Sequence, residues 1–186
     1  MDNKADFTKI KHALYNDSTI SLALFVGLES CKDLKQAVMT GTIEAALLKT
    51  TMIVDPFQVL VAANKAVHLH HTSSMTTKNV HSEILFCLSP SKNISESFRS
   101  FGVSDADTSV FVAVVNDHED QTLTKVSEIL GKIPTPLEEV SEIADTQLIT
   151  KVYKLTEEEL SVYAILDAVV SRIAAKDIIT AGKGKH

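Results

Sequence analysis

The strongest pattern of hydrophobic and polar positions lies at residues 55–71, where apolar side chains recur at helical spacing around almost the whole wheel. Asp55 is the expected N-cap, because its carboxylate can accept from the first unpaired N–H groups. Pro56 suits the first helical position, because it has no N–H to leave unpaired. The inward positions are Val59, Ala62, Ala63, Ala66 and Leu69, widened by Phe57, Leu60 and Val67. The pattern predicts a central, mostly buried helix over about 56–70.

A narrow polar stripe interrupts this helix at Asn64, Lys65 and His68, which share one face. The residues alone allow two interpretations. The stripe is a solvated edge, with Asn64 bonded to a neighbouring loop and Lys65 extending to water, or it is a binding surface. The pattern itself does not separate the two.

Two further segments follow a strand pattern. Residues 19–26 alternate in polarity, and residues 108–115 are almost wholly β-branched or apolar. Residues 50–54 (TTMIV) predict a third, buried strand, preceded by a short helix over residues 43–48 (IEAALL). Shorter helices are predicted between Ser30 and Gly41, over 81–90, over 95–101, over 121–131, around 137–143 and from Asp145 onward.

The last large element is predicted as one helix over about 157–176, capped by Thr156 with Glu159 in the capping-box position. Its apolar arc is broader than one contact with a sheet requires. The arc comprises Leu160, Tyr163, Leu166, Val170, Ile173 and Ala174, extended by Val162, Ile165 and Val169; Asp167, Ala168 and Arg172 are among the residues of the opposite, polar face. The helix is therefore deeply packed, or part of its arc docks on another protein.

Composition narrows the class of protein. The 186 residues suit a single domain, with 1–179 as its body and 180–186 as a flexible basic tail. A net charge of −6 and only 5% aromatic residues argue against a general nucleic-acid surface. The polar start and the lack of a long apolar run indicate no signal peptide, no membrane partner and an intracellular protein. Cys31 and Cys87 are interpreted as buried thiols in a reducing compartment.

Candidate chemistry is sparse. His68, His70 and His71 invite a metal interpretation, but no carboxylate or cysteine cluster accompanies them, and histidines also complement a helix C-terminus. Cys87 lies in an apolar run, which makes a thiol inert, and the acidic residues 116–120 form an expected solvated turn. The sequence predicts no cofactor, metal site or catalytic residue. The residues alone favour a mixed α/β partner-binding module over an enzyme.

Three stretches carry a family resemblance: IVDPFQVLVAANKAVHL at 53–69, SEILFCLSPSKNISESFRSFGVS at 82–104 and KVYKLTEEELSVYAILDAVVSRIAAKDII at 151–179. In their order, their spacing and their amino-acid residues, these stretches resemble the family of small kinase-binding subunits of the KEOPS, or EKC, complex. The resemblance implies an α+β single domain, a mostly antiparallel sheet flanked by helices, without an active site. It also implies direct binding to a PRPK-type kinase/ATPase, indirect contact with other KEOPS subunits, and residence in cytoplasm and nucleus.

In that family the complex attaches threonylcarbamoyl to adenosine (t6A) in ANN-decoding tRNAs, and archaeal relatives are associated with holding the tRNA 3′ CCA end. The resemblance makes the arc of the last helix, with Leu166, Asp167, Val170 and Ile173, the candidate kinase contact. The stripe of Asn64, Lys65 and His68 becomes a candidate tRNA contact within the complex. The competing function is an autonomous RNA-binding protein, which would bind tRNA alone with a clear salt dependence.

Overall fold

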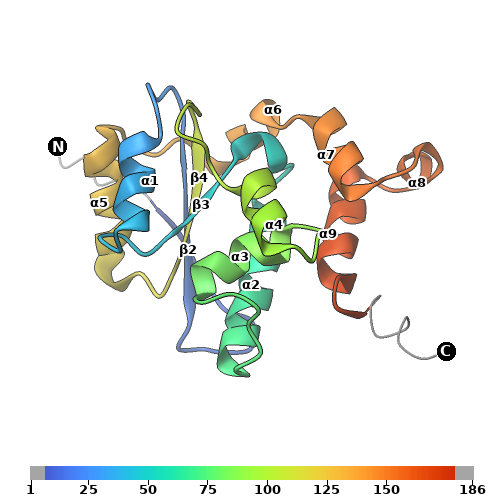
Figure 1. Cartoon of the computed structure of the whole chain (residues 1–186), viewed down its shortest axis with the longest axis horizontal. Helices are drawn as coiled ribbons and strands as arrows, with labels where there is room; N and C mark the ends of the chain where they lie inside the picture. Colours follow the sequence, from blue (N-terminus) through green and yellow to red (C-terminus); the bar gives the residue numbers. More distant parts are fainter. Residues whose placement is uncertain (1–6, 179–186) are drawn as a thin grey trace.

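The computed structural model describes residues 7–178 as an α+β fold built on one antiparallel sheet (Figure 1). The strands are β1 (Thr8–Lys11), β2 (Thr19–Phe25), β3 (Ala46–Leu48) and β4 (Val110–Val115). They lie in the order β1-β2-β4-β3, so β4 is central, and five of its six residues are buried. Its β-branched and aromatic side chains suit a strand covered on both faces. The predicted fold class is confirmed.

Helices cover both faces of the sheet and extend beyond one of them (Figure 1). They are α1 (Lys32–Met39), α2 (Pro56–His71), α3 (Val80–Leu88), α4 (Ile94–Phe101), α5 (Gln121–Leu130), α6 (Val140–Ile143), α7 (Thr146–Tyr153), α8 (Glu157–Val162) and α9 (Ile165–Ala175). Short 3-10 helices occupy Thr50–Met52, His118–Asp120 and Leu137–Glu139. Within residues 7–178, no helix has the length and apolar character needed to cross a bilayer.

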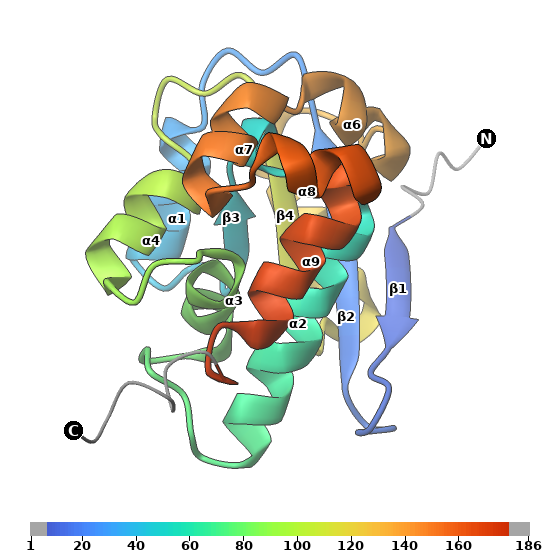
Figure 2. The same ribbon diagram turned by 90° about the vertical axis from the view of Figure 1, so that its right-hand side faces the viewer.

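The sheet separates two hydrophobic cores, because alternate strand residues point to opposite faces. One core lies under α1 and α5 and includes Phe25, Leu34 and Val126. The larger core lies under α2 and α3, and α9 packs along α2 on the outer side of that layer (Figure 2). Helices α1 and α5, the sheet, and helices α2 and α3 thus form three layers. Helix α8 and the start of α9 lie at the end of the molecule farthest from α1 and α5 (Figure 1).

The central helix forms as predicted. Asp55 Oδ1 accepts from the Phe57 N–H at 2.8 Å, and Pro56 is the first helical residue. Val59, Ala62, Ala63 and Ala66 are fully buried, which lets neighbouring backbone approach α2 closely. Phe57 differs from the prediction, since half of its surface is exposed on the first turn.

Residues 43–54 reverse the predicted order of helix and strand. The expected helix over 43–48 contains strand β3, and the expected strand over 50–54 begins with the 3-10 helix Thr50–Met52. Pairing of Ala46 with Ala113 and of Leu48 with Phe111 explains the first error, because the edge of β4 offers a ladder that outweighs the helix propensity of alanine and leucine. Strand β1, which pairs with β2, was not predicted.

The predicted single helix over 157–176 is two helices with an extended break at Tyr163 and Ala164. An ion pair spans the break: Arg172 Nη1 and Nη2 donate to the Glu159 carboxylate at 2.8 and 2.7 Å. In one straight helix these side chains, 13 residues apart, would be separated by about 20 Å. The break therefore turns α8 back so that the ion pair closes the corner.

Two further expectations need correction or lie out of reach. Asp117, placed in a solvated turn by the sequence, is 4% exposed and caps the start of α5 by accepting from the Thr122 and Leu123 N–H groups. Its buried carboxylate is stabilised by these two donors. The predicted tail at 180–186 lies outside the described residues.

Candidate docking surface

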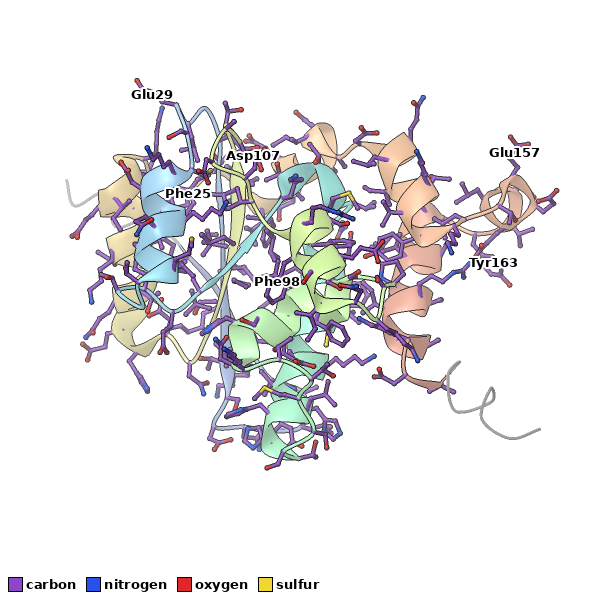
Figure 3. The ribbon with its side chains drawn as sticks, in the orientation of Figure 1. Phe25, Glu29, Phe98, Asp107, Glu157 and Tyr163 are labelled. Carbon is purple, nitrogen blue, oxygen red and sulfur yellow. The ribbon has the colours of Figure 1, made fainter. Side chains whose placement is uncertain are left out.

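The corner between α8 and α9 exposes two large apolar side chains that are adjacent in the sequence. Val162 is 73% exposed and Tyr163 is 59% exposed, although both were assigned to the apolar arc of the last helix. Tyr163 and Glu157 lie on the part of the chain that projects away from the sheet (Figure 3). An exposed aromatic residue beside an exposed valine at a projecting corner is typical of a protein-binding surface. We call Val162 and Tyr163 the docking corner.

Charge around the docking corner is negative. Glu157 and Glu158 are exposed in the first turn of α8, and Asp167 is exposed in the first turn of α9. The carboxylates complement the positive ends of the two helix dipoles, which explains why acidic residues occupy both first turns. Apart from Arg172, which is paired with Glu159, the described residues of α8 and α9 bring no cation to this corner.

The four predicted kinase-contact residues do not share one exposed face. Leu166 and Val170 are half-buried and Asp167 is exposed, whereas Ile173 is 1% exposed and belongs to the core. Ala168, expected on the polar face, is also buried. The buried face of α9 therefore differs from the face predicted for a single helix. The break at Tyr163 and Ala164 lets α9 turn so that it packs on α2 through Val169 and Ile173. Three of the four residues therefore have accessible surface for a partner.

The polar stripe on α2 is engaged within the protein. Asn64 Nδ2 donates to the Leu60 carbonyl at 2.8 Å, and Asn64 Oδ1 lies 3.4 Å from the Ala13 N–H. Lys65 Nζ donates to the Ile173 carbonyl at 3.0 Å and pairs with Asp177 at 2.8 Å. His68 Nδ1 lies 2.9 Å from the Tyr15 hydroxyl. The structure thus brings Asn64 and His68 to the β1–β2 loop, and Lys65 to the end of α9.

The histidines and cysteines considered as candidates for chemistry make structural contacts or are buried. The His71 ring stacks on Tyr15 at 3.8 Å between centroids, and its Nε2 lies 3.1 Å from the Ser18 hydroxyl. No group of three or more histidine, cysteine or acidic side chains suited to a metal ion occurs within residues 7–178. Burial raises the pKa of the Cys31 thiol to about 11 and that of Cys87 to about 12. Both cysteines are therefore protonated, buried thiols, as expected from the sequence.

A cleft that the sequence did not indicate opens between α1, β3, α3 and α4. It measures about 650 Å³ and is walled by apolar side chains that include Met39, Leu85 and Phe98. Phe98 lies on α4, on the side of the sheet away from α1 and α5 (Figure 3). Its 37% exposure and the 74% exposure of Met39 leave apolar surface open to a ligand. No local motif marks the cleft, because its walls come from four elements between residues 35 and 104.

Charged side chains also line the cleft, and among its lining residues the cations Lys35, Lys49 and Arg99 outnumber the carboxylate of Glu44. Lys49 and Arg99 line it, and neither side chain makes an ion pair or hydrogen bond within the described part of the chain. Lys35 lines it too, paired at 2.8 Å with Asp105. His81 lies at its base, 9% exposed, and Nε2 accepts the Val115 N–H at 3.1 Å. Cations above apolar walls can hold an anionic ligand that carries a flat apolar group.

Comparison with known proteins gives one consistent result. The family model described as kinase binding protein CGI-121 matches residues 25–177. The EKC/KEOPS complex subunit TPRKB of Danio rerio is 42% identical over 168 residues, covering 89% of this chain and 95% of that protein. The EKC/KEOPS complex subunit cgi121 of Aspergillus fumigatus is 34% identical over 73% of this chain and 76% of its own length.

The corresponding subunit CGI121 of Yarrowia lipolytica is 30% identical over 75% of this chain and 81% of its own length. The names of the family and of these relatives describe kinase binding and membership of a complex, and none of them describes a catalytic activity. The match extends from the end of β2 to the residue after the Lys176 cap of α9, so it includes both the cleft and the docking corner. The chain therefore belongs to the family of kinase binding proteins CGI-121.

Proposed function

We propose that this protein is a non-catalytic subunit of a KEOPS/EKC complex that binds a PRPK-type kinase/ATPase through the docking corner. The observation that carries the proposal is the exposure of Val162 and Tyr163 at a projecting corner, within a chain whose relatives are named as subunits of that complex. Leu166 and Val170 add half-buried apolar surface on the next turns. Burying this surface on a partner would remove apolar area from water.

The negative charge of the corner supports a basic partner face. Glu157, Glu158 and Asp167 surround the apolar residues as an acidic rim, which is the arrangement expected of a protein interface with an apolar centre. Rim charges of this kind accelerate association and set the preference for one partner. The kinase affinity should therefore fall as salt is raised, mainly through a slower association rate.

The test is calorimetry of the full chain with the kinase. Tyr163→Ala should weaken binding roughly thirtyfold, the size of loss typical of an aromatic residue at the centre of an interface. Ile133→Ala is the matched control, because Ile133 is 64% exposed but lies beyond α5, away from the corner. Equal affinities for Tyr163→Ala and Ile133→Ala would refute the docking corner, and no binding by the unaltered chain would refute the proposed function.

We further propose that the subunit supports t6A modification of tRNA by receiving an RNA 3′ end in the cleft between α1 and α4. The cleft supports this better than the stripe on α2, because Lys49 and Arg99 remain available whereas Asn64, Lys65 and His68 have internal partners. Phe98 and Leu85 offer apolar surface for a terminal base. RNA ends are recognised in this way, by cations on phosphate and stacking on the base.

This second proposal is tested with the assembled complex and two forms of one tRNA, with and without its last nucleotides. The double variant Lys49→Ala, Arg99→Ala should bind intact tRNA more weakly and lower the salt slope by about 2, while its preference for the intact end is lost. Lys125→Ala is the control, since Lys125 is exposed on α5 outside the cleft. Unchanged discrimination would refute the cleft, and equal binding by the isolated chain would favour the autonomous RNA-binding function.

A further inference from the structure

The C-terminal end of α9 is attached to α2 by Lys65. Its Nζ donates to the carbonyl of Ile173 at 3.0 Å and forms an ion pair of 2.8 Å with Asp177. The Ile173 carbonyl lies in the last turn, where helix carbonyls have no partner within the helix. A cation at this position satisfies the free acceptor and complements the negative end of the dipole. The Lys65 side chain is only 18% exposed, so its charge is held at this contact.

A second lysine attaches the same end of α9 to α3. Lys176, the C-cap residue that follows α9, is 7% exposed, and its Nζ donates to the Phe86 carbonyl. The same Nζ lies 3.4 Å above the centre of the Phe86 ring, a cation–π contact shielded from water. A buried lysine that makes both contacts with one residue fixes the height and the rotation of the helix end on α3.

The two lysines line one small cavity. It measures about 80 Å³ and is lined by Lys65 and Lys176 together with Glu83, Cys87 and Asp177. Glu83 is occupied elsewhere, because its carboxylate accepts from the Thr76 and Thr77 N–H groups and from the Thr77 hydroxyl. Lys65 therefore reaches from α2 to α9, and Lys176 reaches from α9 to α3. We call these two lysines the α9 clamp.

The docking corner depends on where α9 lies. The helix has 11 residues, too few to be stable alone, so its position comes from packing and from contacts at its ends. Arg172, in the last turn of α9, also joins this helix to α8 through its ion pair with Glu159, and Figure 2 shows α9 lying along α2 with α8 at its upper end. A loose C-terminal end would let the whole helix tilt, and the corner would move with it.

We propose that Lys65 and Lys176 are positioning residues for kinase binding: the α9 clamp holds the docking corner in its binding-competent orientation. This inference rests on the proposed function and adds residues that touch no partner themselves. A preorganised corner binds without the cost of ordering α9, so loosening the clamp lowers affinity without removing any contact. It also changes the effect expected of replacing Lys65. The sequence made this residue a candidate contact for tRNA, whereas the clamp predicts that its loss weakens kinase binding.

The experiment compares Lys65→Met, Lys176→Met and the control Lys125→Met, each in the full chain. Methionine keeps an unbranched apolar side chain and removes the donors, and Lys125 is an exposed residue of α5 far from the clamp. Calorimetry with the kinase should give roughly tenfold weaker binding for each clamp variant and no change for the control. Amide hydrogen exchange should be faster over 169–178 in both clamp variants, because the last turns of α9 open more often.

Several outcomes decide against the clamp. Unchanged kinase affinity in Lys65→Met, in a chain whose unaltered form binds, overturns it. Reduced tRNA retention by Lys65→Met with unchanged kinase affinity also overturns it and makes Lys65 an RNA contact. If Lys176→Met does not fold, Lys65→Arg decides, because arginine retains donors and a charge and should restore most of the binding lost in Lys65→Met. If the unaltered chain does not bind the kinase, the proposed function fails, whereas the exchange data still report on the clamp.

Discussion

Mild acid should destabilise this protein through one buried histidine, His81 at the start of α3. The side chain is 9% exposed, and its Nε2 accepts the N–H of Val115 at 3.1 Å. Protonation would place a hydrogen on Nε2, which would then face the N–H of the last residue of β4 and could no longer accept from it. Burial lowers the pKa of His81 from 6.5 to about 4, and the nearby charge of Asp117 opposes this only in part.

The sign follows from comparing the two states. The unfolded chain takes up the proton near pH 6.5, whereas the folded protein takes it up near pH 4. The stabilisation is therefore complete above pH 6.5 and is lost as the pH falls from 6.5 towards 4. With these pKa values, going from pH 7 to pH 5 lowers the free energy of unfolding by about 2 kcal/mol. A loss of this size is a large fraction of the stability of an ordinary domain.

The measurement is urea denaturation at pH 7, 6 and 5 for the unaltered chain, His81→Gln and His118→Gln. Glutamine can still accept from the Val115 N–H through its amide oxygen, but it does not titrate. The exposed His118 serves as the control for replacing a histidine. Subtracting the His81→Gln series from the unaltered series isolates His81 from every carboxylate that both chains share. A flat difference between pH 7 and pH 5 would contradict the buried, neutral histidine.

Two stability predictions concern helix packing, one between α2, α3 and α7 and one at the end of α4. Tyr153→Phe should lower the free energy of unfolding by about 1–3 kcal/mol, because the buried hydroxyl donates to the Leu88 carbonyl at 2.5 Å and receives an N–H from Gln58 at 3.3 Å. Thermal denaturation with Tyr163→Phe as the exposed control would test it, and equal midpoints would contradict it. Gly102→Ala should cost about 1–3 kcal/mol in urea denaturation, since a Cβ there would lie 2.5 Å from the Phe98 carbonyl oxygen. An unchanged midpoint would mean that α4 shifts freely.

The sequence by itself determined the elements whose signals are local. Helix α2 begins at Pro56 after an Asp55 cap, as expected, because the cap and the proline act within one turn. Strand β4 was identified because its β-branched residues suit a strand buried on both faces. The family resemblance likewise depends on the order of residues, and the family model and the named relatives confirm it.

Tertiary structure decided the elements whose partners lie far away in the chain. Residues 43–48 have a helical composition, yet β3 forms there because β4, more than 60 residues later, offers an edge to pair with. The cleft has no local signature in the sequence, because Lys49 and Arg99 line the same cavity only once α4 has packed beside β3.

Lys65 shows the same limit at a single residue. Its place on the stripe could be derived from helical spacing, but its partner is a carbonyl 108 residues later in the sequence. Hydrophobic periodicity predicts which face of a helix is polar, but it does not predict which residues contact that face. The contact of Lys65 with the Ile173 carbonyl depends on the break at Tyr163, which turns α9 onto α2 and brings the end of α9 within reach of the amine. The physical reason is that helix caps and hydrophobic periodicity depend on residues close together in the sequence. Ion pairs and strand pairing instead join residues that are far apart in the sequence and become neighbours only in the folded chain.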